Sequence, residues 1–517
     1  MKSIAISCGA LSALSVLPLT QANAKEKPQQ RPNFLVIMVD EMRWNAMGCE
    51  GDPIVRTPNL DRLAATGVRF ANMYSVSPVS CPARKSLFTG RYPHVHGVTG
   101  NDMAANDGEL DLPLILRHYG YRTAIAGKLH FTPITVDWGF DYFWTYHLLE
   151  GPRKEQDYVQ YMLTKYKPAD LRSVPGPFPK DPMGRDLGTY KYPVGDFEAN
   201  WLTDRSIDFL RMQRGSDQPF FLFTSILQPH SNYVGCEPYA SMYKPSDMPY
   251  EEVDPAAQKQ RLKIIEDGGD FKPARGIAPP PEVQQAAKAA YYGHVTCVDD
   301  NIGRLMAELE RLGLDKNTVV IFTADHGNML GEHSSWFKGK MYEGSSHIPL
   351  LVKAPAGLEC GKWFKPGSVV PELIEQTDIM PTILDMASLA IPAGVQGKSF
   401  LTLMKGGKWK NCVYSELTDY MLIEDGYKLI VNRKDRRNVE LYRPQEDRRE
   451  KNNLAADPAH KERIARMLAK IDVWQAQKPA PPEIKGLEKP AYLFRANLRP
   501  EQLNEKSPNA YNNANRN

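Results

Sequence analysis

The sequence has little net charge, few cysteines and, beyond its first 24 residues, no apolar run long enough to cross a bilayer. A formal net charge of +3 over 517 residues gives no reason to expect a nucleic-acid partner. The seven cysteines are scattered, without a CxxC pair or a zinc-like spacing. Internal repeats are not found. What is present, 42% hydrophobic and 24% charged residues, is the composition of a globular protein and excludes wholesale disorder.

The first 24 residues are typical of a secretory signal. Lys2 gives a positive start, residues 4–19 are apolar, and Ala22-Asn23-Ala24 is a small-x-small cleavage site. A membrane anchor is the alternative, but the apolar stretch is short and is interrupted by Ser, Gly and Pro18. We therefore expect a secreted or periplasmic protein of a Gram-negative bacterium, with no membrane span. Cleavage leaves six cysteines, enough for one or two disulfides in an oxidising compartment. The sequence does not indicate which cysteines would pair.

The length predicts one large domain and a smaller one. Apolar runs alternate with helical patterns over the first 400 residues, which predicts an α/β fold with a large, mostly parallel or mixed sheet flanked by helices. Short alternating segments then predict a smaller antiparallel sheet followed by a helix at 460–475. Two long stretches, 150–194 and 232–280, are expected to be insertions. The expected divisions are the signal at 1–24, a large domain at 25–400, an α+β subdomain at 401–477 and an extended tail at 478–517.

Four apolar runs that are predicted strands end in polar side chains. These side chains are Asp40 and Glu41, Lys128 and His130, His230, and Asp325 and His326. Solvated loop acids and structural histidines are the ordinary interpretation of each pair taken alone. However, strand ends in an open parallel sheet line one crevice, so we expect these groups to meet.

The stretch at residues 77–90 is predicted to be a loop that turns into a helix. Pro82 suits a first helical position, Ser80 lies just before it near the cap, and Arg84 follows about one turn later. A hydroxyl, a guanidinium and a helix N-terminus around one point would receive a tetrahedral oxyanion. An ordinary capped helix start explains Ser-x-Pro alone equally well.

The pattern Ser80-x-Pro82-x-Arg84, followed by Leu-Phe-Thr-Gly-Arg-Tyr-Pro at 87–93, resembles the signature of the type I sulfatases of the alkaline phosphatase superfamily, in its serine form. Gly-Lys-x-His at 127–130, Pro-His at 229–230 and Asp-His-Gly at 325–327 continue the resemblance. It implies that 25–400 is the catalytic domain and that Ser80 is oxidised to 3-oxoalanine, or formylglycine, by an anaerobic radical-type maturating enzyme. Cys81 lies one residue out of register with the pattern, and Ala83 replaces the commoner Ser.

The resemblance also implies the roles of the site residues. One divalent cation, calcium, would be held by Asp40, Glu41, Ser80, Asp325 and His326. The catalytic residues would be Ser80, Arg84, Lys128, His130, His230 and Lys338. Among these, Lys128 and Lys338 would bind the sulfate, His230 would protonate the departing alcohol, and His130 would accept a proton from residue 80. Carboxylate oxygens suit calcium, whereas an imidazole ligand also suits zinc or manganese.

The implied function is an exported sulfatase that cleaves sulfate esters of sugars, with a sulfated glycan or a small sulfate ester as substrate. Two alternatives stay open from the sequence. One is a phosphonate or phosphodiester hydrolase that shares the formylglycine site. The other is a non-catalytic protein that binds sulfated glycans and keeps Ser80 unmodified.

Overall fold

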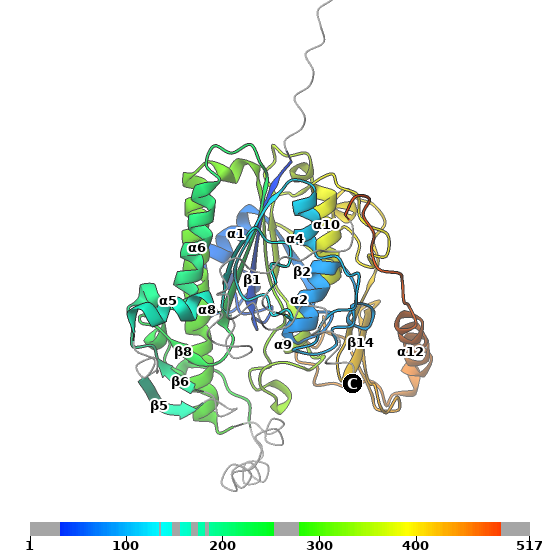
Figure 1. Cartoon of the computed structure of the whole chain (residues 1–517). Coiled ribbons are helices and arrows are strands. Elements are labelled where there is room, and N and C mark those ends of the chain that lie inside the picture. Colours follow the sequence, from blue (N-terminus) through cyan, green and yellow to red (C-terminus); the bar gives the residue numbers. More distant parts are fainter. Residues whose placement is uncertain are drawn as a thin grey trace, which may run out of the picture.

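The computed structural model describes residues 31–133, 136–146, 156–166, 174–180, 186–252 and 279–487. The expected signal at 1–24 and residues 488–517 of the expected tail lie outside these ranges. The described residues form a large mixed sheet with helices on both faces and a small antiparallel sheet beside it (Figure 1). This arrangement confirms the fold class expected from the alternation of apolar runs and helical patterns.

Strand β1 (Asn33–Asp40) lies inside the large sheet and is buried along its whole length. It pairs in parallel with β7 (Phe220–Pro229) on one side and β9 (Thr318–Ala324) on the other. Its continuous apolar sequence is what a strand covered on both faces requires. The order across the sheet is β10-β2-β11-β9-β1-β7-β3-β4, and β12 also pairs with β2. The remaining strands are β2 (Val68–Tyr74), β3 (Arg122–Gly127), β4 (Tyr142–Thr145), β10 (His347–Ile348), β11 (Leu350–Lys353) and β12 (Ser368–Glu375).

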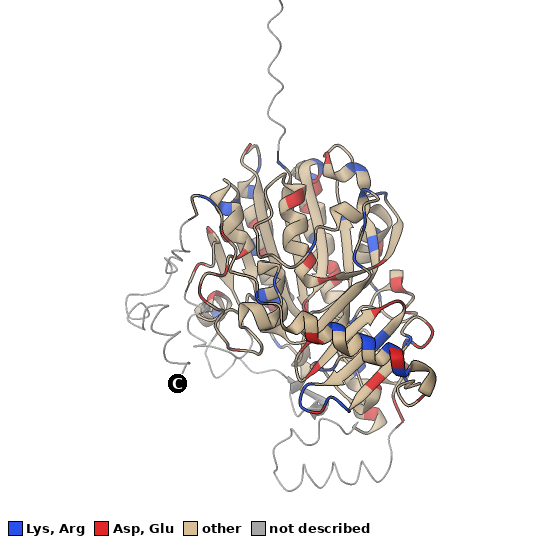
Figure 2. Cartoon of the chain, turned by 90° about the vertical axis from the view of Figure 1, so that its right-hand side faces the viewer, with Lys and Arg blue, Asp and Glu red and all other residues tan. Residues whose placement is uncertain are grey.

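The antiparallel pairings of β11 with β9 and with β2 make the sheet mixed rather than purely parallel. Two groups of helices cover its faces (Figure 1). On one face lie α1 (Pro58–Thr66), α6 (Glu198–Met212) and α8 (Pro281–Arg311). On the other face lie α2 (Ser80–Thr89), α4 (Leu112–His118) and α10 (Ile379–Met386). Figure 2 shows cationic and anionic residues interspersed along the ribbons.

The smaller sheet consists of four antiparallel strands in sequence order. They are β13 (Cys412–Glu416), β14 (Asp419–Glu424), β15 (Tyr427–Asn432) and β16 (Val439–Tyr442), and α12 (Lys461–Gln475) packs on them. Its attachment to the large domain includes the buried ammonium of Lys428, which lies 3.1 Å from Glu343 and 2.8 Å from Glu450. The structure thus contains the smaller antiparallel sheet, followed by a helix, that was expected after residue 400.

Two local expectations differ from the structure. Helix α2 begins at Ser80, with Val79 as its cap, so Pro82 is its third residue and not its first. A proline is tolerated there because the amides of the first helical turn have no acceptor within the helix. The expected insertions also contain α5 (Asp157–Lys165) and a three-stranded sheet of β5 (Val174–Lys180), β6 (Asp186–Thr189) and β8 (Tyr233–Gly235). The prolines of β5 and the long separation of β6 from β8 hide this sheet from a local pattern.

Short elements complete the described chain. They are η1 (Gly48–Glu50), α3 (Pro93–His96), η4 (Val194–Asp196), η5 (Tyr239–Ser241), η6 (Pro245–Asp247), η8 (Leu314–Asn317), η9 (Glu332–Ser334), α9 (Glu343–Ser346), η10 (Cys360–Trp363), η11 (Gln376–Asp378), α11 (Leu401–Met404) and η12 (Pro458–His460). Among the helices in the described ranges, none combines the length and the apolar character needed to cross a membrane.

Candidate active site

The C-terminal ends of four parallel strands lie side by side at one edge of the large sheet. Strands β9, β1, β7 and β3 are neighbours in that order. Their ends carry the polar side chains that the sequence singled out, each at most 8% exposed: Asp40, Glu41, Lys128, His130, His230, Asp325 and His326. The topology of the sheet therefore brings these groups to one buried place, as expected for the ends of parallel strands.

Arg84 lies on α2 at the centre of this cluster and is completely buried. Its guanidinium donates to Asp325 Oδ2 at 2.9 Å and to Asp40 Oδ2 at 3.2 Å. It also donates to the carbonyl of Lys128 at 2.7 Å and to Ser225 Oγ at 2.8 Å. A buried cation needs such complete pairing to offset the loss of its hydration. Arg84 thus fixes the relative positions of two acids that come from neighbouring strands.

Ser80 is the first residue of α2 and is also completely buried. Its hydroxyl lies 3.2 Å from His326 Nε2 and accepts from Lys128 Nζ at 3.4 Å. The same ammonium lies 2.7 Å from Asp40 Oδ2. The hydroxyl is therefore surrounded by an imidazole, a cation and a carboxylate at the start of a helix, where the dipole favours negative charge.

Lys338 reaches the cluster from the loop that follows η9. Its ammonium lies 2.7 Å from His230 Nε2 and 3.4 Å from Glu41 Oε2. His230 Nε2 is itself 3.3 Å from the Glu41 carboxylate, and its Nδ1 contacts the carbonyl of Ser231. Glu41, His230 and Lys338 form a group beside the one around Ser80, joined to it through the adjacent residue Asp40.

Asn328 and Ser225 belong to the cluster but were missed in the sequence. The amide of Asn328 donates to Glu41 Oε1 at 3.1 Å and to the Tyr233 hydroxyl at 3.0 Å. The side-chain Oδ1 of Asn328 accepts from the backbone amides of Leu330 at 2.9 Å and Phe337 at 3.0 Å. Asn328 follows Asp325 by three residues on the same strand-end loop, which was the one available signal. Ser225 lies within an apolar strand, so nothing local marks it.

His130 lies on the turn after β3, with a positive φ of 61°. The thiol of Cys81 donates to its carbonyl at 3.0 Å, which links this turn to the residue after Ser80. The turn also requires Gly127, with φ +124°, because a Cβ there would lie 1.8 Å from the carbonyl oxygen of Ser225. The side chain of His130 lines a small hollow with Lys85, Phe131 and Trp138, among others. His130 thus lies at the edge of the cluster that contains Lys128.

The side chains of Asp40, Asp325 and His326 could hold a metal ion, because one ligand atom from each lies within 4.8 Å of the others. Asp40 Oδ1 is buried and accepts no hydrogen bond from the described residues, and it lies 3.7 Å from His326 Nε2. A second group of the same kind joins Asp40 with Glu41 and His230. Carboxylates with one imidazole and the hydroxyl of Ser80 form a donor set that fits a divalent cation.

The electrostatics of the cluster favour the protonation states that a metal ligand needs. Burial alone would raise the pKa of Asp40, but the charges of Lys128, His230, Arg84 and Lys338 outweigh it and hold this pKa well below its usual value. Burial lowers the pKa of His326 to about 4. The acid is therefore ionised and the imidazole neutral near neutral pH, the forms in which each binds a cation.

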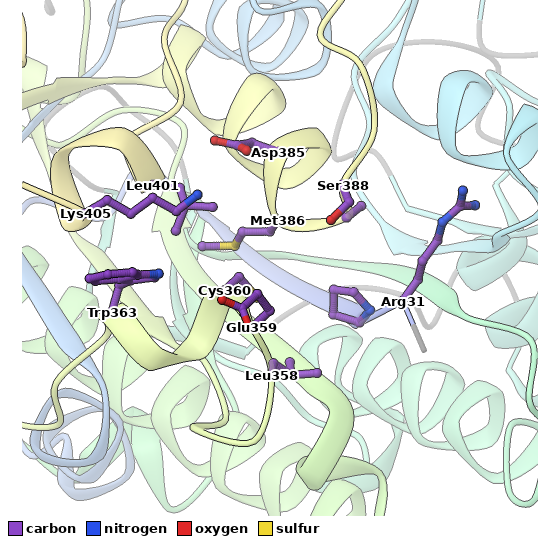
Figure 3. A pocket seen from close by; sticks show the side chains of 12 residues that line it. Arg31, Leu358, Glu359, Cys360, Trp363, Asp385, Met386, Ser388, Leu401 and Lys405 are labelled. Atoms are coloured by element: carbon purple, nitrogen blue, oxygen red, sulfur yellow. The ribbon is translucent and has the colours of Figure 1, made fainter. Parts of the chain in front are cut away.

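A second pocket, of about 490 Å³, lies at the opposite end of β1 (Figure 3). Residues 31 and 32, which precede the strand, line it together with Trp363 and Cys360. Its charged side chains include the carboxylates of Glu359 and Asp385 as well as the cations of Arg31 and Lys405. None of the residues that line this pocket is among the catalytic or metal-binding residues predicted from the sequence.

Comparison with known proteins identifies the family. The model of the family described as "Sulfatase" matches residues 32–389, and that described as "N-sulphoglucosamine sulphohydrolase, C-terminal" matches residues 331–477. An arylsulfatase of Clostridium perfringens is 34% identical over 462 residues, which cover 84% of this chain and 92% of the relative. An N-acetylglucosamine-6-O-sulfatase of Bacteroides thetaiotaomicron is 27% identical, with 95% and 93% covered. A solved structure of a phosphonate monoester hydrolase from Silicibacter pomeroyi has a TM-score of 0.72 at 25% identity, covering 86% of this chain and 95% of that one.

The family model spans most of the large domain and includes every strand end that contributes to the cluster. The relative at 34% identity covers most of both chains. On these matches the chain is an enzyme rather than the non-catalytic binding protein considered from the sequence. It belongs to the sulfatase family, within the alkaline phosphatase superfamily, and is a sulfuric ester hydrolase.

Proposed function

We propose that this enzyme is an exported sulfatase that removes sulfate from carbohydrates, with a formylglycine made from Ser80 as nucleophile and one calcium ion as cofactor. The observation that carries the proposal is the position of the Ser80 hydroxyl. It lies 3.2 Å from His326, inside the buried cluster that holds Asp40 and Asp325. An oxidisable side chain and a cation site in one place are what formylglycine chemistry needs.

The proposed modification gives residue 80 a second hydroxyl group, which the release of sulfate requires. A hydrated aldehyde at residue 80 supplies one hydroxyl for attack on sulfur and a second whose deprotonation expels sulfate, whereas an unmodified serine lacks the second. Oxidation of serine, in place of cysteine, implies an anaerobic radical-type maturating enzyme as partner. Cys81 is not the modified residue, since its thiol donates to the carbonyl of His130 and its spacing to Pro82 and Arg84 is one residue too short.

The cation would be held by Asp40, Asp325, His326 and the side chain at residue 80, with Glu41 beside them. Bound there, calcium would supply positive charge that lowers the pKa of a hydroxyl and polarises sulfuryl oxygens. Arg84 acts as a positioning residue, because four of its five N–H donors go to the two aspartates, Ser225 and the carbonyl of Lys128.

The remaining residues bind the ester and move protons. Lys128 lies 3.4 Å from Ser80 Oγ and is placed to stabilise charge on the sulfuryl oxygens, and Lys338, 3.4 Å from Glu41 Oε2, is the second cation for this role. His230 Nε2 and Lys338 Nζ are 2.7 Å apart and share a proton, which passes to the departing alcohol oxygen. His130 takes the proton from the second hydroxyl at residue 80.

The substrate class rests on the similarity to a relative named N-acetylglucosamine-6-O-sulfatase, which matches 95% of this chain. The test is to produce the protein with and without a radical-type maturating enzyme under anaerobic conditions. In the matured sample the peptide containing Ser80 should be two hydrogens lighter, and only that sample should release sulfate from a panel of position-defined sulfated sugars. Ser80→Ala should be inactive, while Cys81→Ala should still be modified. Sulfate release by matured Ser80→Ala would overturn the proposal.

A second candidate is hydrolysis of phosphonate monoesters, favoured by the similarity to the Silicibacter pomeroyi enzyme. The two activities would share the nucleophile, and both esters carry one negative charge, but the atom attacked is sulfur in one and a carbon-substituted phosphorus in the other. Values of kcat/KM for matched aryl sulfate and aryl phosphonate esters decide between them. We expect the sulfate ester to be preferred, and a preference for the phosphonate ester would make the second candidate the primary function.

A further inference from the structure

The segment that follows His230 lies along helix α8. A Cβ on Gly293 would come within 2.3 Å of the carbonyl oxygen of Tyr239, so a glycine is needed for this close approach. On the same face of α8, Cys297 lies about one turn beyond Gly293 and Asp300 about two turns beyond it. The hydroxyl of Tyr239 donates to the carboxylate of Asp300 at 2.8 Å. The contact between the two segments is thus fixed on both sides of Cys297.

Between these two contacts, the thiols of Cys236 and Cys297 are hydrogen-bonded to each other. They are 1% and 0% exposed, respectively. The sulfur of Cys297 also accepts from the side-chain amide of Asn301 at 3.7 Å, while both cysteines are reduced in the structure. Two thiols that are hydrogen-bonded to each other, on segments held together by the contacts of Tyr239 with α8, are placed to form a disulfide bond.

We propose that Cys236 and Cys297 close into a disulfide when the chain folds in an oxidising compartment. The thiolate of one cysteine attacks the disulfide of a donor, either oxidised glutathione or an oxidised thiol–disulfide exchange protein, and forms a mixed disulfide. The second thiolate attacks the protein sulfur of that mixed disulfide and releases the donor. Two electrons and the two thiol protons pass to the donor, which leaves as two thiols.

The closure must precede burial of the pair. The hydrogen bond from Cys236, together with burial, raises the pKa of the Cys297 thiol, and the thiolate is the form that reacts. Exchange is therefore fast while the segment at 230–240 is still docking on α8 and slow once it has docked. The same burial protects the finished disulfide from reductants.

The disulfide would affect the active site by restraining the segment that leads from His230 to Cys236. Cys236 lies six residues after His230, and between them the hydroxyl of Tyr233 accepts the amide of Asn328, which also holds Glu41. A covalent link to α8 thus anchors the segment that delivers His230, and it closes a chain loop of about 60 residues, a length at which cross-links restrict the unfolded state strongly. The thiols themselves contact no proposed catalytic group, so their oxidation stabilises the site without taking part in the reaction.

The test is a count of free thiols in the same mature chain made in two ways, exported by a host signal into an oxidising periplasm and retained in a reducing cytoplasm. Each sample is denatured without reductant and alkylated, and its intact mass is measured by mass spectrometry. The exported sample should carry two alkyl groups fewer than the cytoplasmic one, and its digest should contain a linked peptide pair with Cys236 and Cys297. Six alkylated thiols in the exported sample, or a link between other cysteines, would overturn the inference.

Variants sharpen the result. Cys236→Ser and Cys297→Ser should each abolish the difference between the two samples. Cys360→Ser is the matched control, since Cys360 is 6% exposed and lies at the other end of the sheet. It should keep the two-thiol difference. Cys236 and Cys297 could form the disulfide in the host periplasm and yet be reduced in enzyme isolated from its natural source. That result would contradict the proposed export, while the inference that the two thiols are placed to bond would be kept.

Discussion

Replacement of Asn328 tests whether this buried amide organises the active site. The side chain is completely buried and uses both donors and two acceptor positions. Asn328→Ala leaves the backbone amides of Leu330 and Phe337 without partners. A buried, unsatisfied group costs about 1–3 kcal/mol, so the two amides together cost about 2–6 kcal/mol of unfolding free energy.

Asn328→Asp separates stability from function. The aspartate keeps an acceptor for the amides of Leu330 and Phe337 but replaces the donor to Glu41 with a second carboxylate. We expect it to unfold at a denaturant concentration between those of the wild type and of Asn328→Ala. The loss in kcat/KM, expressed as a free energy, should exceed the loss in unfolding free energy, because Glu41 is displaced from His230 and Lys338.

The assay combines urea unfolding, followed by fluorescence, with steady-state kinetics on matured protein. A matched control is Asn301→Asp, a buried asparagine of α8 whose amide donates within its own helix to the carbonyl of Cys297. It should lose stability with kcat/KM nearly unchanged. If Asn328→Ala unfolds within about 1 kcal/mol of the wild type, less than a single unsatisfied group costs, the reasoning about these amides is wrong.

Three further predictions concern the charges of the molecule. Arg84→Met removes the cation between Asp40 and Asp325 and should cost about 3–5 kcal/mol of unfolding free energy, the range for breaking a buried ion pair; a loss below 1 kcal/mol in urea unfolding would contradict this. Chelation should abolish sulfate release, and calcium should restore it with one ion bound per chain by elemental analysis, because the buried Asp40 Oδ1 accepts no hydrogen bond from the described residues. Full activity of metal-free protein would refute the cation site. Burial lowers the pKa of His294 to about 4, below its unfolded value of about 6.5. Between these two pH values the unfolded chain binds more protons than the folded chain. About 3 kcal/mol of unfolding free energy is therefore lost as the pH falls from 6.5 to 4. His294→Gln should flatten the dependence of unfolding free energy on pH over that interval, and an unchanged slope would show that other groups cause it.

The sequence was most informative where the chain is continuous and buried. The apolar run before Asp40 predicted a strand, and the short alternating segments after residue 400 predicted the small sheet, because the side-chain pattern of a strand is visible within the strand itself. The gathering of Asp40, Lys128, His230 and Asp325 followed from a rule about parallel strand ends and needed no measured distance. Their roles, in contrast, came from the resemblance and stay predictions.

What the sequence could not provide depends on contacts between distant segments. Asn328 matters because its amide reaches Glu41 on one strand and Tyr233 on another, and neither partner is close in sequence. The pairing of Cys236 with Cys297 depends on how the segment after β7 lies on α8, which no spacing of cysteines encodes. The sheet of β5, β6 and β8 was missed for the same reason, since its pairing of β6 with β8 spans more than 40 residues.

The balance of charge in the cluster connects the proposed cofactor to the proposed reaction. Three carboxylates, Asp40, Glu41 and Asp325, face three permanent cations, Arg84, Lys128 and Lys338, so these formal charges cancel. His326 is neutral, and His230 adds a charge only when it is protonated. A divalent cation added to this balanced group makes it doubly positive in a buried place where charge is weakly screened. A sulfate ester brings one negative charge and the released sulfate carries two, so the metal-loaded cluster matches the product side of the reaction more closely than the substrate side. The paired acids and cations thus keep the empty site stable, and the excess charge that favours sulfate is supplied by the metal alone.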